Sequence, residues 1–307
     1  MRFAVEAWAP EYGSSLEEEV LEPTEAGVDP DVERPLSRWE PLAPPPATSL
    51  PERILFTDGV RRVDAMVWIE GENASSSLGI CASYGAGAVL CDGRAEVVAA
   101  KVERGLFTSF SQAEAIRCRH AVYPLRRPAC DSPEKLTFAL QQRMGELEVS
   151  LALAEEADLV VVDGRLAGRQ NVPAAVGYVK SHDRSYLPEP AAGVIAHLHP
   201  GERTPLFLMP SSRSPLYSWY LRLPGGRGHS WAGVVRCEAS ADTELARAVR
   251  LADTVAATLP RFASASHKDP RAPQNLYPIA GLERALWRRL GDQTLLCRGL
   301  QKAAGAA

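Results

Sequence analysis

The chain lacks the features that mark membrane, secreted, zinc-ribbon and ATP-binding proteins. It has no apolar stretch long enough to span a bilayer, and Met1–Glu6 lacks the apolar segment of a secretion signal. The six cysteines form no CxxC pair, so neither a zinc ribbon nor, without export, a set of disulfides is expected. Gly225-Gly226-Arg227-Gly228 lacks the Lys-Ser/Thr pair of a phosphate loop. These absences predict a cytoplasmic protein that does not associate with membranes.

Net charge is also small, but it is unevenly distributed. The total is −4, which is unusual for a protein that binds nucleic acid. The first 50 residues hold 11 acidic and 3 basic residues, whereas the rest of the chain holds 27 acidic and 31 basic residues. The body is therefore mildly basic, which permits binding to a polyanion.

Residues 1–51 differ in composition from the rest of the chain. They are acidic and carry a proline cluster at Pro41, Pro44, Pro45, Pro46 and Pro51. We expect an extended arm that wraps the body, with Trp8 and Trp39 as anchors; a largely disordered tail is the alternative. We expect residues 52–299 to form one domain and residues 300–307 to be a frayed tail.

Hydrophobic patterns and turn residues predict an α/β order for the body. A long helix is expected to begin at Ser132-Pro133-Glu134, because serine caps, proline suits the first turn and glutamate suits the helix dipole. Strands are predicted over residues 53–58, 62–70, 78–91, 96–102, 158–163, 206–209, 218–223 and 229–237, and helices over residues 132–156, 171–182, 241–258 and 278–290. A three-stranded meander, a helix and a parallel strand form the core order of an RNase H-like fold, a mixed sheet flanked by helices.

Two of the predicted strands end in aspartate followed by glycine. The first is Ile54-Leu55-Phe56-Thr57-Asp58-Gly59 and the second is Leu159-Val160-Val161-Val162-Asp163-Gly164. Acids at the ends of buried strands are costly without a cation, and glycine allows close approach of a ligand. In the predicted strand order the first and fourth strands are neighbours, so Asp58 and Asp163 are expected to meet at one sheet edge. Taken singly, each Asp-Gly pair is also a common turn former.

A third acid is expected from the long helix that precedes Asp163. Glu146 and Glu148 are both candidates, and the helical pattern does not decide between them, although Glu148 lies closer to the apolar face. Carboxylate oxygens suit hard divalent cations, and two such ions can hold the attacking water and the leaving oxygen of a phosphodiester.

These motifs resemble the NurA nuclease family. The resemblance is carried by Phe56-Thr57-Asp58-Gly59, by Arg143–Glu148, by Val161–Leu166 and by Val176-Gly177-Tyr178-Val179-Lys180, and in outline it covers residues 53–290. It implies an RNase H-like fold and manganese-dependent (or magnesium-dependent) DNA digestion. It also implies a homodimer that works with a HerA-type hexameric ATPase in DNA end resection.

The resemblance assigns roles to particular residues. Asp58, Glu146 or Glu148, and Asp163 would be catalytic metal ligands, and a late-chain ligand would come from His267 or Asp269. Independently of the resemblance, the positions of four basic residues after the two aspartate motifs lead us to expect that Lys180 contacts the scissile phosphate and that Arg61, Arg62 and Arg184 hold the DNA. The family often has serine after each Asp-Gly pair, where this chain has Val60 and Arg165.

We therefore predict a metal-dependent DNA nuclease. The changed residues after both glycines motivate one alternative, an inactive RNase H-like scaffold that docks on a DNA translocase. A second alternative is a metal-dependent phosphoesterase that acts on RNA or on a small phosphate ester.

Overall fold

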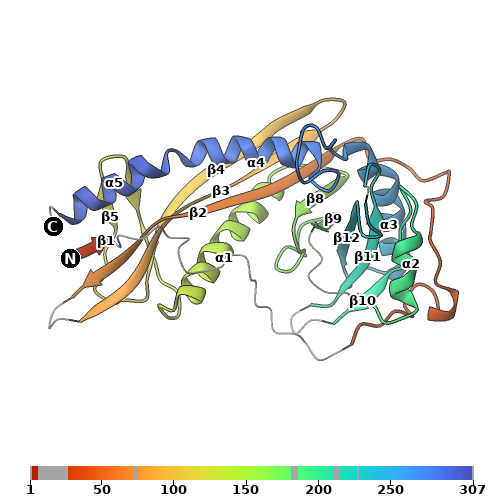
Figure 1. Ribbon diagram of the computed structural model, residues 1–307, viewed down its shortest axis with the longest axis horizontal. Helices are drawn as coiled ribbons and strands as arrows, with labels where there is room; N and C mark the ends of the chain where they lie inside the picture. The colour runs from red at the N-terminus through yellow and green to blue at the C-terminus, as the bar shows by residue number, and fades with distance from the viewer. Residues whose placement is uncertain are drawn as a thin grey trace.

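A mixed β-sheet forms the centre of this protein. The computed structural model describes residues 2–5, 27–71, 75–180, 186–210, 214–226 and 228–305. Within them, a sheet of 10 strands has the order β10-β11-β12-β9-β8-β2-β3-β4-β7, and β1 pairs with the far end of β2. Helices flank the sheet, so the predicted α/β class is confirmed (Figure 1).

The strands and helices have the following bounds. The strands are β1 (Arg2–Val5), β2 (Ile54–Glu70), β3 (Ser76–Cys91), β4 (Ala95–Phe107), β5 (Ile116–Cys118), β6 (Ala121–Tyr123), β7 (Leu125–Arg126), β8 (Leu159–Asp163), β9 (Ala175–Val179), β10 (Phe207–Met209), β11 (Leu216–Arg222) and β12 (Val234–Ser240). The helices are η1 (Leu36–Arg38), α1 (Pro133–Ala152), α2 (Ala191–His197), α3 (Leu245–Thr258), η3 (Leu259–Phe262), α4 (Tyr277–Leu290) and α5 (Gln293–Ala304).

The core has the predicted succession of a three-stranded meander, a helix and a parallel strand, but its third meander strand is β4, since the strands predicted over residues 53–58 and 62–70 belong to the single strand β2. Strands β2, β3 and β4 form an antiparallel meander, helix α1 follows, and β8 then pairs in parallel with β2. Helix α1 begins as expected, with Ser132 as the cap that accepts from the backbone N–H of Lys135, and with Pro133 in the first turn. The first and fourth strands of this core are therefore neighbours.

The structure corrects the prediction of two short strands joined at Gly59. Residues 54–70 form one strand, β2, because every residue around Gly59 has a partner on β3: Asp58 faces Gly87 and Gly59 faces Ala86. Gly59 does not form a turn; its lack of a side chain allows helix α1 to pack against β2. A Cβ atom there would lie 2.2 Å from Oε1 of Glu148 and 2.9 Å from Cγ of Met144, both on α1.

Two further predictions are wrong. The expected helix over residues 171–182 is strand β9, which lies between β8 and β12 and buries Val176 and Tyr178. The expected frayed tail continues helix α5 to Ala304, and Leu300 of that helix is fully buried in a cluster with Val67 of β2. In both places apolar contacts with the sheet decide the local structure.

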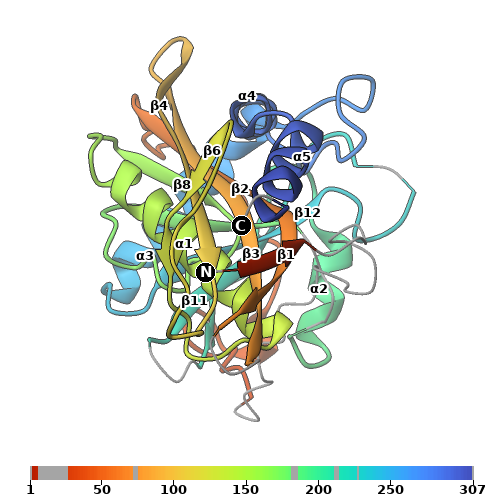
Figure 2. The same cartoon turned by 90° about the vertical axis from the view of Figure 1, so that its left-hand side faces the viewer.

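Helices cover both faces of the sheet. Helices α3 and α4 pack on one face with Phe56 and Val161, and α1 packs on the other with Val63 and Tyr84. The view along the sheet in Figure 2 shows α4 and α5 on one side and α1 on the other. Gly87 of β3 lets α4 approach, because a Cβ atom there would lie 2.8 Å from Cδ1 of Leu282.

The described part of the predicted arm, residues 27–51, lies along the β10 edge of the sheet (Figure 1). Asp29 forms a bridge with Leu208 of β10, and the Trp39 ring packs on Phe207, with ring centroids 6.5 Å apart. Trp8, the other expected anchor, lies outside the described residues. In the sheet order, β11, β12, β9 and β8 separate this edge from β2.

Candidate active site

Asp58 and Asp163 lie side by side where strand β8 ends. The parallel register pairs Thr57 with Val162, and Asp58 and Asp163 each follow directly. Phe56 and Val161 pack in one cluster with α4, so strand alternation puts both aspartates on the α4 face. Strand β8 ends here, but β2 continues as far as Glu70. On the β8 side of β2, the next strand in the described chain is β1, which pairs with β2 only from Val67 onward.

Asp58 is buried and Asp163 is mostly buried, with 14% of its side chain exposed, and the two carboxylates repel each other. Asp58 is 7% exposed, and its Oδ1 accepts a hydrogen bond of 2.7 Å from the backbone N–H of Gly59. Burial raises the pKa of Asp58 well above its ordinary value, and the charge of Asp163 raises it further. Burial also raises the pKa of Asp163, with Lys180 acting in the opposite direction.

Lys180 supplies the cation nearest to this pair. It follows strand β9 directly, and alternation from Val176 and Tyr178 puts it on the same face as the aspartates. Its Nζ lies 2.6 Å from Oδ2 of Asp163 and donates a second hydrogen bond of 3.3 Å to Oδ1 of Asn275. The sequence prediction brought Lys180 into the site, but not the direct ion pair with Asp163.

The structure separates the two glutamate candidates on α1. Glu148 is buried, lies against Gly59 and is held by Arg169, whose Nε is 2.8 Å from Oε2. Glu146 is half exposed and pairs with Arg143. Glu148 approaches β2 from the α1 face, so the strand lies between it and the Asp58 carboxylate, although its charge still adds to the raised pKa of Asp58.

A fourth carboxylate, Glu283 of α4, was missed by the sequence reasoning. It follows Leu282, which packs over the glycine opposite Asp58, and its charge contributes to the raised pKa of both Asp58 and Asp163. Arg271 holds it with a contact of 2.5 Å between Nη2 and Oε2. Glu283 therefore lies on the same side of the sheet as the two aspartates. The only sequence signal was an acid inside an otherwise amphipathic helix.

The two predicted late-chain ligands have different surroundings. His267 is exposed. Asp269 is 6% exposed, and its carboxylate accepts from Asn275 Nδ2 at 2.8 Å and from the backbone N–H of Arg271 at 2.8 Å. Asp269 thus reaches the aspartate pair indirectly, through Asn275 and Lys180.

Of the three predicted DNA-binding arginines, the structure describes Arg61 and Arg62, and these two have different neighbours. Arg61 lies near Glu148 and lowers the pKa of that carboxyl against the larger effect of burial. The Arg62 side chain is only 10% exposed; its Nε donates to Asp64 at 2.8 Å and its Nη1 to the carbonyl of Gly291 at 3.0 Å. In this position Arg62 connects β2 to the junction between α4 and α5. Arg184 lies outside the described residues.

The carboxylate oxygens of this site suit a hard divalent cation, although they are not already arranged to hold one. Across the described residues, no three His, Cys, Asp or Glu side chains already stand in the arrangement that would hold a metal ion. Lys180 and Arg169 each contact a carboxylate oxygen, on Asp163 and on Glu148. The buried aspartates nevertheless present oxygen ligands whose mutual repulsion a cation would relieve. The residues therefore fit such an ion once Lys180 moves aside.

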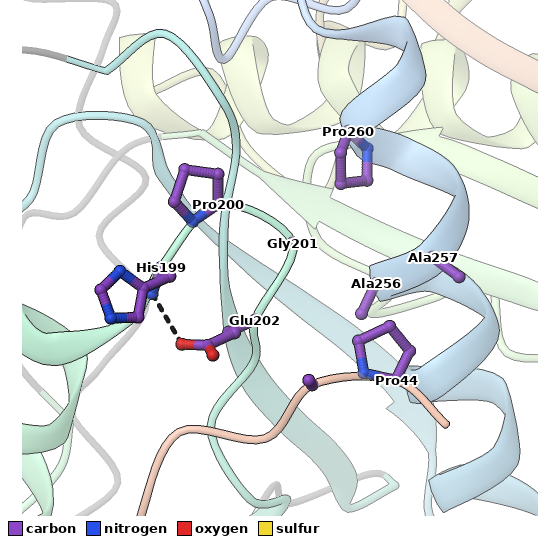
Figure 3. A pocket seen from close by; sticks show the side chains of 9 residues that line it. Pro44, His199, Pro200, Gly201, Glu202, Ala256, Ala257 and Pro260 are labelled. Atoms are coloured by element: carbon purple, nitrogen blue, oxygen red, sulfur yellow. Dashed lines mark hydrogen bonds between the residues drawn. The ribbon is translucent and has the colours of Figure 1, made fainter. Parts of the chain in front are cut away.

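A separate pocket lies between the arm and helix α3. It has a volume of about 370 Å³, and Figure 3 shows that its walls come from the arm, from the loop around Pro200 and from the end of α3. Its carboxylate, Glu202, accepts from the backbone N–H of His199 at 2.8 Å in its own loop. No pair of carboxylates converges there, so the aspartate pair remains the stronger candidate.

Comparisons with known proteins assign no family to this chain. The chain matches no protein-family model, and no curated protein sequence matches it. Within the described part of the chain, no helix combines the length and apolar character needed to cross a membrane.

The raised pKa of Asp58 predicts a stability effect with a defined sign. The folded chain keeps the Asp58 proton to a higher pH than the unfolded chain, so the free energy of unfolding falls as pH rises above the ordinary pKa. Asp58→Asn removes this penalty. In metal-free buffer it should raise the free energy of unfolding by about 1–3 kcal/mol near pH 8, and by little near pH 4.

Urea unfolding at the two pH values measures this effect. Glu146→Gln is the matched control, because Glu146 is half exposed, and it should shift stability by less than about 0.5 kcal/mol at either pH. An Asp58→Asn variant less stable than the wild type near pH 8 contradicts the electrostatic account.

Proposed function

We propose that this protein is a divalent-metal-dependent nuclease that hydrolyses phosphodiester bonds of DNA at the Asp58–Asp163 pair. The observation that carries the proposal is the meeting of two mutually repelling aspartates on neighbouring strands, Asp58 buried and Asp163 mostly buried. Such a pair lowers the stability of the folded protein, and cation binding is a function that accounts for it. Mn²⁺ or Mg²⁺ bound there supplies Lewis-acid stabilisation and an activated water.

The chain's own residues have distinct tasks in this proposal. Asp58 and Asp163 hold the cation, with Glu283 from α4, on the same side of the sheet, completing the oxygen ligands, whereas Glu148 acts on the site from across β2 through its charge. Lys180 donates to a phosphate oxygen of the substrate, because its ammonium lies 2.6 Å from Asp163 at the partly exposed end of β9. Burial under α4 excludes bulk water and strengthens each of these interactions.

The resemblance to NurA nucleases extends the proposal to a cellular role. By that resemblance the chain acts as a homodimer in DNA end resection, together with a HerA-type hexameric ATPase. The strand order β4-β3-β2-β8 around α1 is compatible with the fold of that family.

One observation favours the alternative of an inactive scaffold. Lys180 and Arg169 pair with Asp163 and Glu148, and together they offset two of the carboxylate charges without any metal ion. A protein that had lost catalysis while keeping a docking role would tolerate such internal pairing.

The test is an assay of the purified wild-type chain on end-labelled linear DNA, with Mn²⁺, with Mg²⁺ and with EDTA. RNA and p-nitrophenyl phosphate serve as competing substrate classes. We expect degradation of the DNA that requires the metal and exceeds turnover of the other two substrates. Equal inertness with and without metal, also in the presence of a HerA-type ATPase, supports the scaffold; faster turnover of RNA or of the small ester supports a different phosphoesterase.

A further inference from the structure

Lys180 is held over Asp163 by more than their mutual attraction. Its side chain is 23% exposed, and its ammonium bridges Oδ2 of Asp163 at 2.6 Å and Oδ1 of Asn275 at 3.3 Å. A lysine with two fixed acceptors loses much of the freedom that a surface lysine keeps. The ammonium therefore occupies one oxygen of the aspartate pair in the absence of any ligand.

The second acceptor is itself fixed from behind. Asn275 is fully buried, and its amide nitrogen donates to Asp269 at 2.8 Å, which leaves the amide oxygen directed at Lys180. The same segment is tied to β9, because the Tyr178 hydroxyl donates to the carbonyl of Gln274 at 2.6 Å. The segment between η3 and α4 thus holds an acceptor for Lys180 at a set place beside Asp163.

We propose that Lys180 is an internal counter-ion that occupies Asp163 until a divalent cation binds, and that its release is a step in metal loading. This inference rests on the proposed function for the identity of the competing cation. The ammonium on Oδ2 and a divalent cation on the same carboxylate repel each other and compete for its charge, so metal loading at Asp163 favours the release of Lys180. Asn275 keeps the released ammonium beside the site, where it can meet a phosphate oxygen.

Removal of the lysine charge should tighten metal binding. We expect Lys180→Met and Lys180→Gln to bind Mn²⁺ at least tenfold more tightly than the wild type, because a single neighbouring charge shifts a carboxylate equilibrium by about tenfold or more. The measurement is titration of the full-length chain with Mn²⁺, by calorimetry or by the electron paramagnetic resonance signal of the free ion. Lys302→Met, which removes an exposed lysine on α5, is the matched control and should change the affinity less than twofold.

A double variant shows whether the gain acts through Asp163. In an Asp163→Asn background, Lys180→Met should give a clearly smaller gain in Mn²⁺ affinity, because the direct ion pair is gone and only the charge of Lys180 near Asp58 remains. As a second measurement, Mn²⁺ should raise the melting temperature of Lys180→Gln more than that of the wild type, since glutamine keeps a polar contact without the charge.

The outcomes separate this inference from the function on which it rests. Wild-type and lysine variants that bind Mn²⁺ equally overturn the counter-ion role and leave the nuclease proposal standing. A gain of undiminished size in the Asp163→Asn background also overturns it. Absence of Mn²⁺ binding in the wild type and in both lysine variants overturns the inference and the metal-dependent function together.

Discussion

Replacing Asp58 with asparagine should lower the rate of Mn²⁺-dependent DNA cleavage by about a thousandfold, because bound metal supplies several kcal/mol of transition-state stabilisation and each 1.4 kcal/mol is worth about tenfold in rate. Asparagine keeps the size of the side chain and the oxygen that accepts from Gly59, so the fold around β2 should persist. Asp163→Asn should have a similar effect. The measurement is the initial rate of degradation of labelled linear DNA at saturating Mn²⁺.

Glu146→Gln provides the control for this prediction. Glu146 lies on the same helix as Glu148 but is half exposed and pairs with Arg143, so its loss should leave the rate within about twofold. Full activity in Asp58→Asn contradicts the assignment of the aspartate pair. Equal loss of activity in Glu146→Gln indicates damage that is unrelated to the pair.

Replacing Arg203 with methionine should lower the free energy of unfolding by about 3–5 kcal/mol, the usual cost of removing one partner from a buried ion pair. The Arg203 guanidinium is 2% exposed and is surrounded by two carboxylates. It holds Glu33 of the arm with two contacts of 2.9 Å and Asp253 of α3 with two contacts of 2.8 Å, from Nε and Nη2 to Oδ1. Methionine fills the space but leaves Glu33 and Asp253, which are only 10% and 15% exposed, without their cation.

Urea unfolding measures this loss, and Arg34→Met is the matched control. Arg34 also pairs with a glutamate, at 2.7 Å, but both side chains are largely exposed, so its loss should cost less than about 1 kcal/mol. Equal destabilisation by the two substitutions contradicts a buried clamp at Arg203. A selective loss in Arg203→Met shows that the arm is part of the folded body.

The order of the core could be predicted because its signals are local. The cap at Ser132 and the apolar spacing of the following residues indicate α1, and Leu159–Val162 is an uninterrupted apolar run that ends at Asp163. Once these elements are in order, the meander, the helix and the parallel strand leave few arrangements, and β8 falls beside β2.

The wrong predictions arise where tertiary contacts override a local signal. Pro173 and the following alanines suggest a helix, but Val176 and Tyr178 alternate with Gly177, and Gly177 lies against the backbone of Leu166, so a buried strand forms. Gly59 suggests a turn in the sequence, but in the structure its lack of a side chain leaves room for α1. Composition does not distinguish these two uses of glycine.

The candidate site was predictable only in part. The Asp-Gly motifs and the strand order bring Asp58 and Asp163 together, whereas the choice of Glu148 over Glu146 depends on the rotation of α1 against Gly59. Glu283 is far from both motifs in the sequence, and only the packing of α4 on β3 brings it near. The burial of Arg203 has no local sequence signal at all.

The most direct test of the aspartate pair is a crystal structure of the full chain soaked in Mn²⁺, with anomalous scattering used to locate the metal. The account predicts an anomalous peak within about 2.0–2.6 Å of carboxylate oxygens of Asp58 and Asp163, with Lys180 displaced from Asp163. A structure with no peak at this place and with Lys180 still bonded to Asp163, at saturating Mn²⁺, contradicts it.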